Sequence, residues 1–253
     1  MDKFIIDIVK KAGTSVGKKF GKVGIKYSKE HVNDVVTEAD LHANKIIIDA
    51  IKRKYPDHSI ISEETGEDIR GSKYCWIIDP LDGTLNFATN VPLFGTMIGL
   101  AHKGKVMLGA IYFPLTKELL FAKNGQGAYL NGKRIACSAQ KKWEESYGIL
   151  NSLLSKNETY ASKLFKHNTE KHCYVGSYGS AAINALYVST GRRDWVYFNN
   201  SKIWDKAAPS VIFKESGCNV TRLDGKPWNV NDGDMLVSNK YLHKKFLKVI
   251  QSN

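Results

Sequence analysis

The sequence lacks any long apolar run. Its longest apolar stretches are interrupted by charged residues within about ten positions, so no segment is suited to span a membrane. The first residues, MDKFIIDIVKKAG, alternate apolar and charged side chains and contain no continuous signal-peptide core. We therefore expect a cytoplasmic protein that does not associate with membranes.

Cysteine is scarce, and its four residues are too widely spaced to form a CxxC pair. The seven histidines show no metal-binding spacing either, so a zinc site is disfavoured and buried free thiols are expected. Dense basic segments, repeats and low-complexity linkers are also missing. The net charge of +12 comes from lysines scattered along the chain, which favours a solvated surface over a nucleic-acid partner. The cysteines are Cys75, Cys137, Cys173 and Cys218.

The 253 residues are enough for a single domain with a substantial core, and a change of pattern near Ser138 suggests two lobes, 1–138 and 139–253. Apolar spacing predicts helices at 4–20, 35–55, 160–167, 180–190, 204–216 and 241–250. Short apolar runs predict strands at 59–61, 75–78, 97–101, 106–112, 119–121, 147–150, 173–175, 195–198 and 235–237. The strands between 58 and 135 follow one another without helices, which predicts an antiparallel sheet with hairpin turns at 102–105 and 131–132.

The stretch Asp79-Pro80-Leu81-Asp82-Gly83-Thr84 is the centre of the functional pattern. We expect Pro80 to end the preceding strand and Asp82 to cap a following helix. Two carboxylates and a hydroxyl at a strand end, facing a helix start, suit divalent cations and a phosphate group together. A turn followed by a capped helix, without any chemistry, is the alternative interpretation.

Further acidic residues also lie at the ends of predicted elements. Glu63 and Glu64 follow a strand, Asp205 lies in the first turn of a helix, and Asp40 has capping-box spacing from Thr37. Each alone is typical of a solvated turn or a helix start. Converging carboxylates repel one another unless cations neutralise them, and oxygen-only ligands favour Mg²⁺ or Mn²⁺ over zinc.

These segments, in this order and over nearly the whole chain, resemble the inositol monophosphatase family, within the superfamily that includes fructose-1,6-bisphosphatase. The resemblance implies an α+β fold, a layered α-β-α-β-α sandwich, assembled as a homodimer. It also implies a Li⁺-sensitive hydrolase of phosphate monoesters that uses two or three Mg²⁺ ions, with Mn²⁺ as an alternative. The matching segments are Val36-Thr37-Glu38-Ala39-Asp40, Glu63-Glu64, the run from Trp76 to Phe87, and Trp204-Asp205-Lys206-Ala207-Ala208.

The resemblance also implies a role for each site residue. The expected metal ligands are Glu63, Asp79 and the Leu81 carbonyl for a first ion, Asp79, Asp82 and Asp205 for a second, and Glu64 for a third, weaker one. Catalysis would rest on Glu63 and on Thr84 with Asp40, which orient the attacking water. The backbone N–H groups of Gly83 and Thr84 would hold the phosphate, and Lys29 would lie near the site. Because bound metal requires ionised Asp79 and Asp82, we expect activity to fall at acid pH.

Substrate choice depends on other positions. The resemblance places Gly179, Ser180 and Ala181 on the sugar side, and Asp82 is also expected to contact the substrate. Phe198 stands where animal family members have an inositol-binding glutamate. Phenylalanine accepts no hydroxyl hydrogen bond, so inositol is disfavoured unless a neighbouring asparagine substitutes. The neighbouring residues concerned are Asn199 and Asn200. Arg192 and Arg193 lie nearby in the sequence and could meet a second anionic group, although a surface role is favoured for them.

Inositol 1-phosphate remains the first candidate substrate, and a sugar bisphosphate such as fructose 1,6-bisphosphate is the main alternative. Histidinol phosphate and 3′-phosphoadenosine 5′-phosphate rank behind them. A hypothesis of another class is an RNA- or transcription-associated binding protein, since a basic chain can bind nucleic acid without turnover.

Overall fold

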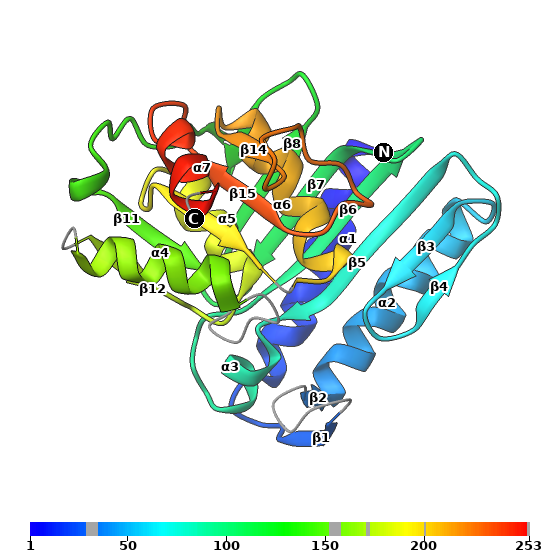
Figure 1. Cartoon of the computed structure of the whole chain (residues 1–253). Coiled ribbons are helices and arrows are strands. Elements are labelled where there is room, and N and C mark those ends of the chain that lie inside the picture. The colour runs from blue at the N-terminus through cyan, green and yellow to red at the C-terminus, as the bar shows by residue number, and fades with distance from the viewer. Residues whose placement is uncertain (29–34, 152–157, 171–172, 200, 252–253) are drawn as a thin grey trace.

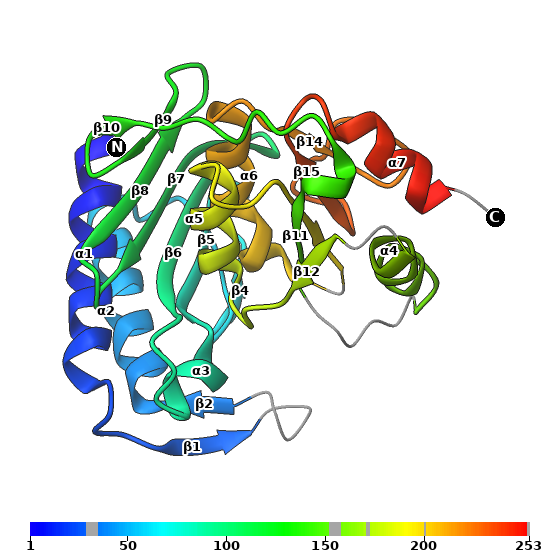
Figure 2. The ribbon, with the colours of Figure 1, turned by 90° about the vertical axis from the view of Figure 1, so that its left-hand side faces the viewer.

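The computed structural model describes residues 1–28, 35–151, 158–170, 173–199 and 201–251, and its elements form five alternating layers (Figures 1 and 2). In Figure 2 a helix pair, a large sheet, a second helix pair, a small sheet and an outer helix pair follow one another across the molecule. This arrangement confirms the predicted α-β-α-β-α sandwich. The helices are α1 Asp2–Lys19, α2 Glu38–Lys54, α3 Thr84–Ala88, α4 Glu158–Glu170, α5 Ala181–Ser189, α6 Ile203–Glu215 and α7 His243–Gln251, with a 3₁₀ turn at Trp143–Glu145.

The first layer consists of α1 and α2, which pack against each other and against the large sheet. The apolar residues of α1 recur every three or four positions and are buried against that sheet. At the start of α2 the predicted capping box is confirmed, because Thr37 and Asp40 exchange hydrogen bonds. The helix begins at Glu38 rather than Val35, since Val35–Thr37 forms the short strand β2, paired with β1 Ile25–Ser28.

The large sheet has eight strands in the order β10-β9-β8-β7-β6-β5-β3-β4. The hairpin turns at 102–105 and 131–132 join strands as predicted. The expectation of a wholly antiparallel sheet is wrong at β3 and β5, which are parallel, because the short β4 takes the outer edge and the chain returns to the inner side of β3. The strands are β3 Ser59–Ser62, β4 Gly66–Asp68, β5 Tyr74–Asp82, β6 Gly95–His102, β7 Lys105–Phe113, β8 Glu118–Lys123, β9 Ala128–Leu130 and β10 Lys133–Arg134.

Strand β5 does not end before Pro80, as the sequence predicted, but continues to Asp82. The pairing with β6 shifts register between Asp79 and Asp82, which are opposite Met97 and Gly95. A proline lacks the N–H that a ladder needs, so it is tolerated at such an irregularity. The bulge therefore carries two aspartates to the end of one continuous strand.

The small sheet has five strands in the order β12-β11-β13-β15-β14 and is covered on its outer face by α4 and α7. Its core includes Trp143 and Trp195, whose rings stack with centroids 5.2 Å apart. The strands are β11 Tyr147–Leu150, β12 Tyr174–Gly176, β13 Trp195–Phe198, β14 Asn219–Thr221 and β15 Met235–Ser238. The large sheet ends at Arg134 and the small one begins at Tyr147, whereas the division into a metal lobe and a substrate lobe near Ser138 stays a prediction.

Helices α5 and α6 fill the layer between the two sheets (Figure 2). Helix α6 lies so close to the large sheet that a Cβ atom added at Gly109 would be 2.6 Å from the carbonyl oxygen of Ala208. The lack of a side chain at Gly109 therefore permits the contact. This close packing fixes α6, and with it Asp205, relative to the end of β5.

Two remaining expectations concern cysteines and membranes. All four cysteines are free thiols, but only Cys218 is buried and the other three are half-buried, so the prediction of buried thiols is wrong for those three. Among the described helices, none combines the length and the apolar character of a bilayer-spanning segment.

Candidate active site

Acidic side chains line a hollow of about 200 Å³ where β5 ends. Asp79 and Asp82 come from β5, and Asp205 comes from the first turn of α6. Glu63 follows β3, which is parallel to β5, and its N–H donates to the Ile78 carbonyl over 3.2 Å. The fold thus brings together acids that lie up to 142 positions apart in the sequence, from Glu63 to Asp205 (205 − 63 = 142).

Three of these carboxylates crowd together. Asp79, Asp82 and Asp205 each offer an oxygen within 4.8 Å of the other two. Burial, followed by the charges of Glu63, Asp82 and Asp205, raises the pKa of Asp79 well above its ordinary value. Within the described part of the chain, the buried Oδ1 atom of Asp79 has no hydrogen-bond partner. An oxygen-only cluster with an orphaned buried oxygen fits a hard cation such as Mg²⁺ or Mn²⁺.

Asp82 does not cap α3, which the sequence predicted. Helix α3 starts from Gly83, whose φ of 81° is left-handed and which makes no side-chain cap. Asp82 is fixed instead by the start of α5, where Ser180 Oγ and the N–H groups of Ala181 and Ala182 donate to its carboxylate. Burial raises the pKa of Asp82, and these three hydrogen bonds act in the opposite direction. The carboxylate is therefore held in one orientation by a helix from the other half of the chain.

Asp205 lies in the first turn of α6, as predicted, and its Oδ2 accepts from the Lys202 N–H over 2.7 Å. Burial, followed by the charge of Asp82, raises the pKa of Asp205 to about 7. The neighbouring Lys206 is buried, and its Nζ donates to the carbonyls of Ser201 and Gly233. The loops that contain Ser201 and Gly233 are thereby tied to α6.

Thr84 and Asp40 lie side by side at the edge of the hollow. Thr84 Oγ1 is 3.0 Å from Asp40 Oδ1 and 2.8 Å from the Leu81 carbonyl oxygen, either of which can accept its proton. The other carboxylate oxygen of Asp40 accepts from the N–H and the hydroxyl of Thr37, over 2.8 and 2.5 Å. Burial raises the pKa of Asp40 to about 6, although the hydrogen bonds from Thr37 lower it. The capping box of α2 thus also orients Asp40 toward Thr84.

The remaining predicted residues divide between those that reach the hollow and those that do not. Leu81, Gly83 and Gly179 line it together with the acids, whereas Glu64 is not among the lining residues. Ser180 and Ala181 are buried and contact Asp82, so a direct role of their side chains on the sugar side is not supported.

The structure corrects the sequence analysis at Phe198, which was expected to contact the substrate. Its side chain is fully buried and packs against the ring of Phe213 in the core beneath β13, so it presents no surface to a substrate. Asn199 is also fully buried. The sequence pattern could not predict the burial of Phe198, because a residue at the end of a strand can face either side of the sheet. Asn200 and Lys29 lie outside the described residues.

Arg192 and Arg193 do not face the hollow. Arg192 pairs with Glu118 over 3.5 Å, and Arg193 donates to the Tyr178 hydroxyl over 2.8 Å while its guanidinium lies over tyrosine rings. The sequence analysis missed two lining residues, Val35 and Leu85. Only the position of Leu85 directly after Thr84 could have indicated one of them.

Comparisons with known proteins agree with this geometry. The model of the inositol monophosphatase family matches residues 1–253. A fructose-1,6-bisphosphatase/inositol-1-monophosphatase from Thermotoga maritima is 34% identical over 247 residues, covering 98% of this chain and 94% of the relative. The Nus factor SuhB of Salmonella typhimurium is 33% identical over 243 residues, covering 94% and 91%. The crystal structure of the extragenic suppressor protein suhB from Bartonella henselae superposes with a TM-score of 0.91 at 30% identity, covering 99% of this chain and 98% of that one.

Proposed function

Since the chain belongs to the inositol monophosphatase family and is a phosphatase of that type, we propose that it hydrolyses polyol and sugar monophosphates with Mg²⁺, inositol 1-phosphate first. The observation that carries this proposal is the convergence of Asp79, Asp82 and Asp205 within 4.8 Å, beside the Thr84–Asp40 pair. A cation-binding cluster next to a hydroxyl–carboxylate pair combines the two requirements of phosphate ester hydrolysis, charge neutralisation and a positioned nucleophile.

The proposed ligands follow the geometry of the hollow. Asp79, with Glu63 and the Leu81 carbonyl, would hold one ion, and Asp79, Asp82 and Asp205 would hold another. Glu64 is the proposed contributor to a third ion. A bound divalent cation would polarise the phosphoryl oxygens and lower the pKa of an attacking water.

The chain's own residues supply position. Thr84 Oγ1 would accept the proton of the attacking water while it passes its own proton to Asp40, and the pair would thereby orient the water. Asp40 is already aligned for this by its hydrogen bond from Thr37. The N–H groups of Gly83 and Thr84 would bind the phosphate oxygens. A side chain at Gly83 is excluded because its Cβ would be 2.8 Å from the Leu93 carbonyl oxygen, and the left-handed φ of 81° also disfavours one.

The choice of a monophosphate rests on the lining of the hollow. Among the described residues, no lysine or arginine lines it, so a second phosphate would meet no cationic side chain there. The non-acidic residues that line it are Val35, Leu81, Gly83, Thr84, Leu85 and Gly179. Phe198 is buried in the core and offers inositol no hydrogen-bond acceptor, so the proposal of inositol does not rest on that position. Fructose 1,6-bisphosphate is the second candidate, in agreement with the name of the Thermotoga maritima relative.

A panel of phosphate-release assays tests the proposal. It contains inositol 1-phosphate, fructose 1,6-bisphosphate, histidinol phosphate and 3′-phosphoadenosine 5′-phosphate, each with Mg²⁺ or EDTA and with or without Li⁺. We expect the fastest Mg²⁺-dependent release from inositol 1-phosphate and inhibition by Li⁺. Release that is unaffected by EDTA would refute the metal assignment, and a clear preference for the bisphosphate would refute the substrate assignment.

A second candidate function comes from the relatives named Nus factor SuhB. By that likeness the chain would bind the transcription machinery through its basic surface, independently of turnover. Steep salt-dependent RNA binding that persists in Asp79→Asn would favour this role. Cytoplasmic location and homodimer assembly stay predictions, the latter testable by sedimentation.

A further inference from the structure

A second cavity, of about 450 Å³, lies at the other end of α6 from Asp205. Its walls come from the turn between β6 and β7, the last turns of α6, and the segment from Cys218 to Val230. From Asp205 to Lys214 the helix rises about 14 Å, at 1.5 Å per residue. The two cavities have no lining residue in common, so this one is separate from the candidate active site.

The charge of this cavity is the reverse of that at the acidic hollow. Lys105 and Lys214 line it, and no carboxylate does among the described residues. Neither lysine forms an ion pair within the part of the chain that the structure describes. Amide groups of Asn124, Asn219 and Asn229 add hydrogen-bond donors. An anionic group is therefore the complementary ligand.

The floor of the cavity is apolar. Trp228, Val211 and Val230 line it and are each less than 10% exposed. The indole of Trp228 is anchored by a hydrogen bond of 3.3 Å from Nε1 to the Gly233 carbonyl. A volume of this size is in the range of small-molecule sites, which are mostly apolar with a few placed polar groups. The ligand should therefore carry a planar apolar body beside its charge.

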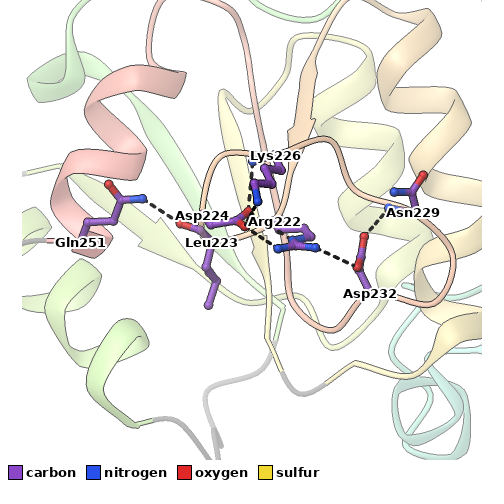
Figure 3. A network of polar contacts seen from close by, with 7 residues as sticks. All are labelled: Arg222, Leu223, Asp224, Lys226, Asn229, Asp232 and Gln251. Carbon is purple, nitrogen blue, oxygen red and sulfur yellow. Dashed lines mark hydrogen bonds and ion pairs between the residues drawn. The ribbon is translucent and has the colours of Figure 1, made fainter.

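A polar network centred on Arg222 connects residues on both sides of Trp228 in the sequence (Figure 3). Arg222 pairs with Asp224 and, over 3.5 Å, with Asp232, and Asp232 in turn accepts from the Asn229 N–H over 2.7 Å. The network fixes the loop that carries Trp228. It also pairs the two acids of this loop with a cation, so that they oppose an anion less.

We propose that this cavity binds a small organic anion with a planar apolar body, at a site independent of the metal centre. Lys105 and Lys214 contact the anionic group, and the body rests on Trp228 and the adjacent valines. The ligand class is an aromatic or similarly flat carboxylate, sulfonate or phosphate. Its binding does not depend on whether the chain is a phosphatase.

Isothermal titration calorimetry with naphthalene-2-sulfonate as the probe tests the site. Two comparison compounds separate its requirements: naphthalene-2-sulfonamide keeps the ring without the charge, and inorganic sulfate keeps the charge without the ring. We expect saturable binding of the sulfonate and at least about tenfold weaker binding of both comparison compounds. Equal affinity for the sulfonamide would overturn the assignment of an anion site.

Two substitutions locate the probe. Lys214→Glu should weaken sulfonate binding at least about tenfold, whereas Lys244→Glu, at an exposed lysine of α7 outside the cavity, should leave it unchanged. Asn219→Trp, at an exposed position of the rim, should block the cavity without disturbing the core. Circular dichroism confirms that each variant is folded.

The independence of the two sites has its own control. Probe affinity should be the same in Asp79→Asn as in the unaltered protein, and the same with saturating Mg²⁺ and phosphate. Displacement of the probe by Mg²⁺ and phosphate, or undiminished binding to both Lys214→Glu and Asn219→Trp, would overturn the proposal.

Discussion

The hollows at the two ends of α6 differ in charge, size and support. The one beside Asp205 measures about 200 Å³ and is lined by Glu63 and the three clustered aspartates, with no basic side chain among the described residues. The one beside Lys214 measures about 450 Å³ and is lined by lysines and amides over an apolar floor. At the acidic end, buried carboxylates repel one another, which is a cost that a protein bears where a cation compensates it. At the basic end the lysine charges are exposed, so they destabilise the fold little and alone do not indicate a binding site. The inference of a site there depends on the apolar floor beneath them.

The largest expected effect is a loss of phosphate release when the carboxylate with the unpaired oxygen, Asp79, is removed at the acidic end. Asp79→Asn should lower phosphate release at saturating Mg²⁺ by at least about 1,000-fold, because this side chain is proposed to contact both ions. The fold should persist, since the substitution removes a buried, repelled charge. Steady-state assays and thermal denaturation in EDTA measure the two results, with Asp49→Asn on the exposed face of α2 as control. Near-native turnover in Asp79→Asn would remove the metal assignment.

The next effect separates positioning of water from cation binding. Thr84→Val should reduce kcat about 100-fold, the scale of a lost proton-transfer partner, and leave the Mg²⁺ affinity nearly unchanged. Thr84→Ser keeps the hydroxyl that faces Asp40 and should recover most of the activity. If kcat falls as far in Thr84→Ser as in Thr84→Val, the Thr84 hydroxyl does not orient the attacking water.

A smaller effect concerns pH and the wall of the basic cavity. His243 lies buried between Thr221, which lines that cavity, and Ser238, with contacts of 2.9 and 2.8 Å. Burial lowers the pKa of His243 to about 4, so the folded state holds the ring neutral. A lowered folded pKa means that this stability is present above about pH 6.5 and is lost as pH falls toward 4. By pH 5 the loss should reach about 2 kcal/mol.

Urea unfolding of the protein and of His243→Gln at pH 7.5 and pH 5 isolates this group, because all other titrating residues cancel in the difference between the two proteins. The stability advantage of histidine over glutamine should shrink by about 2 kcal/mol at the lower pH. An advantage that is independent of pH would show that the ring is not held neutral.

The smallest effect lies at the hydrogen bond that joins Asp82 to α5. Ser180→Ala removes both a donor to Asp82 and the cap that accepts from the Ile183 N–H over 3.1 Å. We expect a loss of about 1 kcal/mol in stability, typical of a missing helix cap, with a modest decrease in kcat. Ser180→Thr should restore both. Thermal unfolding and initial rates measure them, and unchanged values for alanine would contradict the coupling.

Features that depend on residues near one another in the sequence could be predicted. The apolar period of α1, the Thr37–Asp40 capping box and the acids at strand and helix ends were all readable, because each depends on neighbours within a few positions. The α-β-α-β-α order of the layers was predicted only through the resemblance to a family.

Contacts between distant segments were not predictable. The true partner of Asp82 is the start of α5, about a hundred positions away, and nothing near Asp82 announced it. The burial of Phe198 depends on how β13 is rotated against α6, which a single strand pattern does not determine. The basic cavity needs three separate segments to be in place, so no motif describes it.

The close packing of α6 on Gly109 has a consequence for synthesis of the chain. The strands of the large sheet, with α1 and α2, emerge from the ribosome before α6 does. Until α6 docks, the face of the sheet that it covers is exposed. During that interval Asp79 and Asp82 lack the third carboxylate of their cluster, that of Asp205. The cluster that we propose to hold the second ion is therefore complete only after α6 has docked.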